Sequence, residues 1–146
     1  MSGFTLRPAL AEDRAWLCAT KGRCLRPHVE QTWGTWDAAA QRAQFNASFD
    51  PAAIQVIVAA GRDVGYLSAQ YGAQEVQLLN LMINPEFQNQ GIGSAVMRDL
   101  LAAARTRGVP VHLQVLKVNP ARRLYERLGF TVTDETPTHF RMRWQP

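Results

Sequence analysis

The sequence contains few of the features that mark secreted proteins, membrane-spanning proteins or small domains stabilised by a structural metal ion. Its two cysteines, Cys18 and Cys24, are too few for a disulfide framework, and their spacing matches no zinc-binding pattern. No apolar run approaches the length of about 18 residues that a transmembrane helix needs. Residues 1–7 lack the basic segment followed by an apolar one that a signal peptide requires. We therefore expect free thiols, no metal, no membrane association and a cytoplasmic location.

Charge is also modest. The 146 residues include 16 Lys and Arg against 12 Asp and Glu, so the net charge is +4, which suits an anionic ligand as well as a nucleic acid. The basic residues are spread along the chain, and the tryptophans are not interleaved with basic clusters, which argues against nucleic acid. With 47% hydrophobic residues and no linker-like stretch, residues 1–146 are predicted to form a single globular domain.

Apolar periodicity predicts a mixed α/β fold in the order β-α-α-β-β-β-α-β-α-β-β, with about four helices around one sheet. We expect strands at residues 4–7, 54–60, 64–71, 76–83, 111–115, 130–133 and 138–144. Helices are expected at 12–25, 37–49, 92–107 and 120–128. The segment 26–36 is predicted to be a break, because Pro27 and Gly34 punctuate it.

A glycine pair stands where the strand 76–83 gives way to a helix. Gly91 and Gly93 let backbone N–H groups approach a ligand, and the helix N-terminus adds unpaired donors and partial positive charge. This pattern predicts binding of a phosphate or pyrophosphate. It is not a dinucleotide-binding fingerprint, because Val96 occupies the place of the third glycine, and the Gly-Lys-Ser/Thr of a P-loop is absent.

A second strand-to-helix junction follows residues 111–115. Asn119 is a favourable N-cap, and Pro120 suits the first helical position. Arg122 and Arg123 then fall in the first turn, where the helix dipole disfavours cations unless an external anion is bound.

Together the two segments resemble the motifs of the GNAT superfamily of N-acetyltransferases. Residues 88–93, Gln-Asn-Gln-Gly-Ile-Gly, match its Gln/Arg-x-x-Gly-x-Gly/Ala signature, and 119–130 match its second motif, with an Asn at the start and a Tyr before a closing Gly-Phe. The stretch 26–34 also resembles a set of uncharacterised bacterial acetyltransferases. The resemblance implies a splayed sheet with acetyl-CoA between the strand ending at Ile83 and the strand 111–115.

The resemblance also implies a set of cofactor-binding residues. The backbone around the glycine turn would hold the pyrophosphate, the end of the strand before it would pair with the pantetheine arm, and residues of the second motif would contact the rest of the cofactor. These residues are Gln88, Gln90, Gly91, Ile92, Gly93 and Ser94 in the turn, Leu81, Met82 and Ile83 in the strand, and Asn119 and Arg122 in the second motif.

Acetyl transfer from a thioester to an amine requires a neutral amine, a stabilised carbonyl oxygen and a departing thiolate. Tyr125 is a sensible general acid, because a tyrosine stays protonated at pH 7 while the leaving thiol has a pKa of about 8.5. A backbone N–H near Met82 or Ile83 could stabilise the carbonyl oxygen.

The general base is less clear in the sequence. Many members of the superfamily carry a carboxylate on the strand before the glycine turn, where this chain has Asn80. The remaining choices are Glu30, His28, His139 or a chain of water molecules. The resemblance implies that the region of His28 and Glu30 covers the acceptor pocket, and the two tryptophans beside them predict that its walls are aromatic. Its residues are His28, Glu30, Trp33, Trp36 and Asn80.

The sequence thus predicts an acetyl-CoA-dependent N-acetyltransferase that acts on the primary amine of a small molecule or peptide. The alternative is a non-catalytic CoA-binding or sensing module of the same fold, which the missing strand carboxylate favours. The last strand, around residues 140–144, could pair across a homodimer, as in some relatives.

Overall fold

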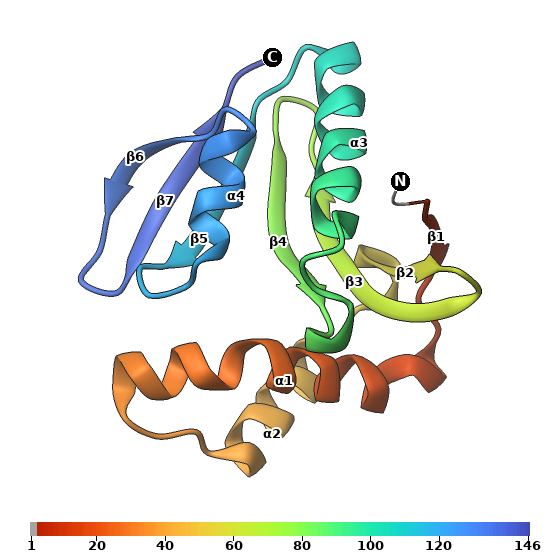
Figure 1. The fold of residues 1–146 in the computed structure, drawn as a ribbon, viewed down its shortest axis with the longest axis vertical. Helices are drawn as coiled ribbons and strands as arrows, with labels where there is room; N and C mark the ends of the chain where they lie inside the picture. The colour runs from red at the N-terminus through yellow and green to blue at the C-terminus, as the bar shows by residue number, and fades with distance from the viewer. Residues whose placement is uncertain (1–2) are drawn as a thin grey trace.

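The computed structural model describes residues 3–146; residues 1 and 2, the start of the segment considered above as a signal peptide, lie outside that range. A seven-stranded sheet in the order β1-β2-β3-β4-β5-β7-β6 forms the centre (Figure 1). Its strands are β1 (Thr5–Pro8), β2 (Ile54–Ala59), β3 (Arg62–Tyr71), β4 (Val76–Ile83), β5 (Val111–Leu116), β6 (Thr131–Glu135) and β7 (His139–Trp144).

The helices are α1 (Arg14–Trp33), α2 (Ala38–Ser48), α3 (Ile92–Arg107) and α4 (Ala121–Arg127). Short 3₁₀ turns η1 (Ala11–Asp13), η2 (Pro51–Ala53) and η3 (Pro85–Phe87) precede α1, β2 and the glycine turn. The predicted order of strands and helices is confirmed.

The sheet splays between β4 and β5. These two strands are parallel, and they pair only at Val76–Val111 and Gln77–His112 before they separate. Figure 1 shows them together at one end and apart at the other. From Leu78 onward, β4 therefore has no strand partner on its β5 side. The predicted splayed sheet is confirmed.

Two apolar clusters cover the two faces of the sheet. On one face, α3 packs its buried Val96 and Met97 against β3, β4 and β5. On the other face, Leu17 of α1 packs with Tyr66 and Met82. Neighbouring residues of β4 consequently serve opposite faces: Leu81 and Ile83 join the α3 cluster, whereas Met82 joins the α1 cluster.

The predicted break at 26–36 is wrong for most of its length. Helix α1 continues through Pro27 to Trp33 and ends at Gly34, whose φ of 86° is the left-handed conformation of a helix C-cap. A proline in a helix removes one backbone hydrogen bond, here to the carbonyl of Arg23. Both Pro27 and Arg23 are exposed, so water can solvate that carbonyl. The extra two turns carry His28 and Trp33 on the helix.

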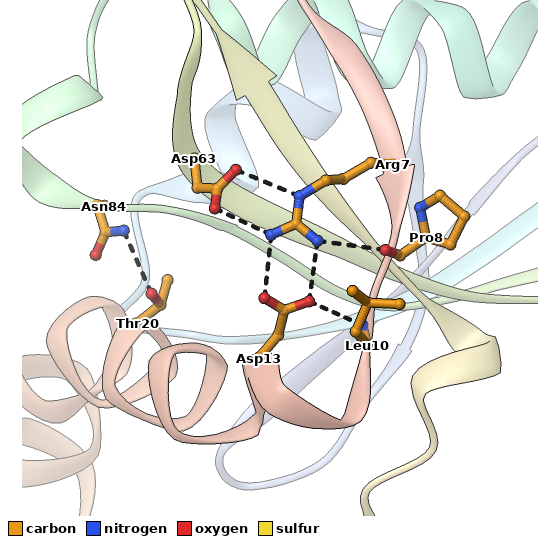
Figure 2. A network of polar contacts seen from close by, with 7 residues as sticks. All are labelled: Arg7, Pro8, Leu10, Asp13, Thr20, Asp63 and Asn84. Carbon is orange, nitrogen blue, oxygen red and sulfur yellow. Dashed lines mark hydrogen bonds and ion pairs between the residues drawn. The ribbon is translucent and has the colours of Figure 1, made fainter.

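A polar network fixes the start of α1 against the sheet (Figure 2). The Arg7 guanidinium donates to both oxygens of Asp13, at 2.9 and 3.1 Å, and also to Asp63. Farther along the helix, the buried Asn84 at the end of β4 donates to Thr20, and Asn84 accepts from Arg23 at 2.8 Å. These bonds hold α1 close to the end of β4.

The suggestion that the last strand pairs across a homodimer is contradicted. Strand β7 lies between β5 and β6, and both of its edges are used in backbone pairing. The outer strands of the sheet are β1 and β6.

Candidate active site

The splay opens a cleft of about 1040 Å³ that passes beside β4 and reaches from the α3–α4 face of the sheet to α1 and α2. Its walls include the exposed half of β4, the turn before α3, the end of β5, α4 and the second half of α1. Of the predicted site residues, the cleft is lined by Leu81, Met82, Ile83, Gln88, Gly91, Ile92, Gly93, Ser94, Asn119, Tyr125, His28, Trp33 and Asn80.

A β-bulge shapes the middle of the cleft. Ser68 of β3 lies opposite Asn80, but Ala69 lies opposite Leu78, so Leu79 has no cross-strand partner. A bulge bends its strand and re-aims side chains. Leu79 is 44% exposed and lines the cleft, and the residues after the bulge follow the free edge of β4.

The turn before α3 presents a set of unpaired donors. Asn89 and Gly91 have positive φ angles, 62° and 81°, which fold the chain tightly ahead of the helix. No side chain caps Gly91. Within residues 3–146, the backbone N–H groups of Gly91, Ile92, Gly93 and Ser94 make no hydrogen bond; the first bond of this end is from Ala95 to the carbonyl of Gly91.

This geometry suits an anion. Four N–H groups at the start of a 16-residue helix combine direct donors with the positive end of the helix dipole. Arg123 and Arg127 of α4 line the same cleft. A diphosphate with its negative charge therefore fits the residues present.

The second motif is placed somewhat differently from the prediction. Helix α4 begins at Ala121, with Pro120 as the N-cap, and the Asn119 side chain accepts from the N–H of Ala121 at 2.9 Å. The Arg122 guanidinium stacks on Phe140 at 4.8 Å and does not line the cleft. Sequence reasoning chose between two adjacent arginines, and the helical rotation turns the second one, Arg123, toward the cleft.

Tyr125 lies in the cleft wall and is 7% exposed. Its ring packs edge-on against Phe130, with ring centres 5.8 Å apart. Its hydroxyl makes no hydrogen bond within residues 3–146. Burial raises the pKa of Tyr125 to about 12, so the group is a protonated donor at neutral pH.

The α1 side of the cleft holds imidazoles, a thiol and amides. His28 and Trp33 come from α1, and the Trp33 ring lies 6.3 Å from the ring of His139 at the start of β7. The Nδ1 atom of His139 is 2.8 Å from the hydroxyl of Thr138, which orients the imidazole. Cys24 donates its S–H to the carbonyl of Ile83, and burial raises the pKa of this thiol to about 11. The thiol is therefore protonated at neutral pH.

Four predicted residues do not line this cleft: Arg122, described above, and Glu30, Trp36 and Gln90. Glu30 faces Arg26, with the closest oxygen and nitrogen 3.4 Å apart. Trp36 lines a second, smaller hollow between α1 and α2. Gln90 donates to the carbonyl of Glu86. Among residues 3–146, none of those that line the cleft is an Asp or Glu.

Several lining residues were absent from the predicted site. Lys21, Cys24, Gln41 and Gln44 come from the two N-terminal helices. For Lys21 and Cys24 the sequence offers one signal, their helical spacing from the buried Leu17; for Gln41 and Gln44 it offers none.

A family model described as an acetyltransferase (GNAT) domain matches residues 52–132, more than half of the chain. This range runs from the second 3₁₀ turn into β6 and includes the glycine turn, α3 and α4. The chain belongs to the GNAT acetyltransferase family.

Two curated relatives illustrate the range of that family. The mycothiol acetyltransferase of Thermomonospora curvata is 35% identical over 124 residues, which cover 82% of this chain and 41% of that protein. The [ribosomal protein bS18]-alanine N-acetyltransferase of Haemophilus influenzae is 33% identical over 72 residues, which cover 49% of each chain. The chain thus matches less than half the length of either relative.

Solved structures share the fold. The PaiA N-acetyltransferase from Thermoplasma acidophilum, in complex with coenzyme A, superposes with a TM-score of 0.77 at 17% identity and covers 99% of both chains. A GNAT acetyltransferase from Rhodopseudomonas palustris gives a TM-score of 0.77 at 19% identity, over 100% of this chain and 98% of that one.

The described part of the chain offers neither a membrane-spanning helix nor a metal-binding cluster. Among residues 3–146, no helix is long and apolar enough to cross a membrane. The same part of the chain holds no group of three or more His, Cys, Asp or Glu side chains arranged to bind a metal ion.

Proposed function

We propose that this protein is an acetyl-CoA-dependent N-acetyltransferase that transfers the acetyl group to a primary amine of a small molecule or peptide. The observation that carries the proposal is the set of four unpaired N–H groups, Gly91 to Ser94, at the end of a cleft that opens beside a free strand edge. The relatives support it, since one is a mycothiol acetyltransferase and another a [ribosomal protein bS18]-alanine N-acetyltransferase, and one structural neighbour is in complex with coenzyme A.

In this proposal the diphosphate lies on the N–H groups of the glycine turn, with Arg123 and Arg127 supplying positive charge. The pantetheine arm follows the unpaired edge of β4 and meets Asn119, whose amide nitrogen is available because its oxygen already caps Ala121. The acyl end then lies between Tyr125 and the bulged part of β4. The acceptor enters from the α1 side, near Asn80 and His28.

The co-substrate supplies a thioester whose carbon–sulfur bond is replaced by a carbon–nitrogen bond. Tyr125 would donate its hydroxyl hydrogen toward the departing sulfur. The pKa of Tyr125, about 12, is higher than that of a thiol in water, about 8.5. Against a thiolate with that ordinary pKa, the tyrosine would donate a hydrogen bond more easily than it would transfer its proton completely. Burial in the cleft also destabilises the departing thiolate and so raises the pKa of its thiol. The proton affinities of the thiolate and of the Tyr125 phenolate are thereby brought closer together.

The proton of the attacking amine needs an acceptor. Because no Asp or Glu lines the cleft, the candidates that remain there are the imidazoles of His28 and His139. The unprotonated nitrogen of a neutral imidazole can accept a proton, so an imidazole is a competent general base. Glu30, which pairs with Arg26 away from the cleft lining, is a weaker candidate.

Two measurements test the function. Coenzyme A should raise the Tm, because a ligand at 100 times its Kd adds about 2.7 kcal/mol to the free energy of unfolding. Release of CoA thiol from acetyl-CoA should then depend on an added amine. No Tm shift at millimolar CoA would contradict the binding site.

The missing cleft carboxylate also fits a second function, a CoA-binding module without catalysis. In that case CoA would raise the Tm, but no amine in a broad panel would promote thiol release. The two functions are therefore separated by turnover alone.

A further inference from the structure

The two ends of the cleft lie on opposite faces of the sheet. The glycine turn leads into α3, which packs on one face, while Lys21 belongs to α1, which packs on the other face with Met82. The arginines that line the cleft, Arg123 and Arg127, come from α4, which joins the α3 face. The negative charge of a bound nucleotide is therefore met on one face, and Lys21 is left on the acceptor face.

Lys21 occupies a position that would ordinarily be apolar. Leu17, Lys21, Cys24, Leu25 and His28 follow the i, i+4, i+7, i+8, i+11 spacing of one helical face. Leu17 is fully buried, and the other four line the cleft. Lys21 is itself half-buried, and burial lowers the pKa of its ammonium group.

No carboxylate compensates this ammonium group. Within residues 3–146, Lys21 forms no ion pair and no hydrogen bond, and its ammonium nitrogen lies 5.9 Å from the centre of the Phe45 ring, with which Lys21 also lines the smaller hollow between α1 and α2. The whole cleft lining is free of Asp and Glu. A partly desolvated cation without a partner is unfavourable by itself, and an anion from outside would reverse that penalty.

Neutral hydrogen-bonding groups surround the same end. Gln41 and Gln44 of α2 and Asn80 of β4 line the same cleft as Lys21, and Gln41 also lines the smaller hollow with it. Amide groups can orient a carboxylate and leave its charge to the lysine. A polyamine or a basic peptide would instead bring a second positive charge to a surface with no negative one.

We propose that Lys21 binds an anionic group on the acceptor, so that the preferred substrate is an amine that also carries a carboxylate, such as an amino acid. The inference rests on the proposed acetyltransferase function and deepens it. Lys21 is a specificity residue in this proposal. Its ammonium group pairs with the carboxylate of the acceptor, so that the amine of the acceptor is directed to the thioester.

The experiment compares amino acids with their carboxamides, which differ only in the charge of the acid group. The carboxamide lowers the pKa of the neighbouring amine, so intrinsic reactivity favours the amide. We expect wild-type kcat/KM to favour the acid by about 10- to 150-fold, the range of a hydrogen bond to a charged group. In Lys21→Gln the ratio of acid to amide should fall to one or below, mainly through KM of the acid, whereas Lys21→Arg should keep the preference for the acid.

Control variants are available in the chain. Lys117 is the only other lysine, and it pairs with Glu135 at 2.8 Å outside the cleft lining, so Lys117→Gln should keep the wild-type ratio. Lys21→Glu should shift the preference toward diamines. The rise in Tm with CoA reports whether each variant is folded.

Three outcomes would overturn the inference: a wild-type preference for the carboxamide or a diamine, an equal loss for acid and amide in Lys21→Gln, or no change in that variant. If no amine is acetylated at all, the proposed acetyltransferase function fails. Binding of an N-acetylated amino acid then still tests whether Lys21 recognises a carboxylate. Calorimetry should then show the N-acetylated amino acid binding more tightly than its carboxamide to wild type but not to Lys21→Gln; equal or absent binding would refute it.

Discussion

Replacing Tyr125 by phenylalanine separates the catalytic role of its hydroxyl from any structural role. In the folded protein the side chain is 7% exposed, and its hydroxyl makes no hydrogen bond within residues 3–146. Removing the oxygen therefore breaks no protein hydrogen bond, and the edge-on contact with Phe130 is retained. We expect the free energy of unfolding to change by no more than about 0.5 kcal/mol.

The effect on turnover should be much larger. A hydrogen bond to a charged group contributes about 1.5–3 kcal/mol, and each 1.36 kcal/mol is a factor of ten in rate, so kcat should fall by about 10- to 150-fold. Release of CoA thiol, followed with a thiol-reactive dye at saturating acceptor, measures this directly. The KM for acetyl-CoA should change little, because the interaction forms mainly as the sulfur departs.

Tyr66→Phe is the matched control. Tyr66 is also buried with an unpartnered hydroxyl, but it lies in the α1 cluster and not in the cleft lining. It should retain wild-type kcat and be as stable as wild type or slightly more so, because an unsatisfied buried hydroxyl is removed. A loss of kcat below twofold in Tyr125→Phe, or the same loss in both variants, would refute the role given to Tyr125.

Three further results are expected. Gly91→Val should abolish the CoA-induced rise in Tm, because a side chain at φ 81° strains the turn and blocks the phosphates, whereas Gly108→Val, also at a positive φ but with open space around it, should keep the rise; titration of each variant with CoA checks this. Arg7→Ala should lower the free energy of unfolding by about 1–2 kcal/mol in urea, since it removes a bidentate, partly exposed pair. The hydrogen bond from Arg7 also lowers the pKa of Asp13 in the folded protein. The stabilisation by this ion pair is therefore complete above the usual aspartate pKa and should be lost as the pH falls through the lowered pKa of Asp13. Arg7→Ala should weaken this dependence of the free energy of unfolding on acidic pH. At alkaline pH, stability should fall as pH rises from about 10 toward 12, because the folded state holds the Tyr125 proton more tightly than the unfolded chain, and Tyr125→Phe should weaken this dependence in pH-dependent thermal melts.

Much of the fold was predictable because its signals are local. Gly91 at a positive φ, the unpaired N–H groups after it and the Asn119 cap follow from short-range backbone geometry, which a few neighbouring residues decide. The alternation of strand and helix periods likewise gave the element order. Pro27 misled the prediction, because one missing hydrogen bond on an exposed face is too small a penalty to end a helix that tertiary packing supports.

The acceptor side of the site was less predictable. Its residues come from α1, α2, β4 and β7, and their meeting depends on how α1 crosses the end of β4. Sequence reasoning placed Trp36 and Glu30 in the pocket because they stand near His28 along the chain. The helix directs Glu30 toward Arg26, and Trp36 follows the helix end into a different hollow.

The sequence by itself determined the order of strands and helices along the chain, the glycine turn and the resemblance to the GNAT family, since each rests on spacings within a few turns or one strand. Only the tertiary structure decided that Arg123 rather than Arg122 lines the cleft, that Lys21 and His139 reach it from opposite ends of the chain, and that no carboxylate does. The physical reason is that backbone conformation responds to neighbouring residues, whereas the charge of a cleft is the sum of side chains that packing brings together from distant segments.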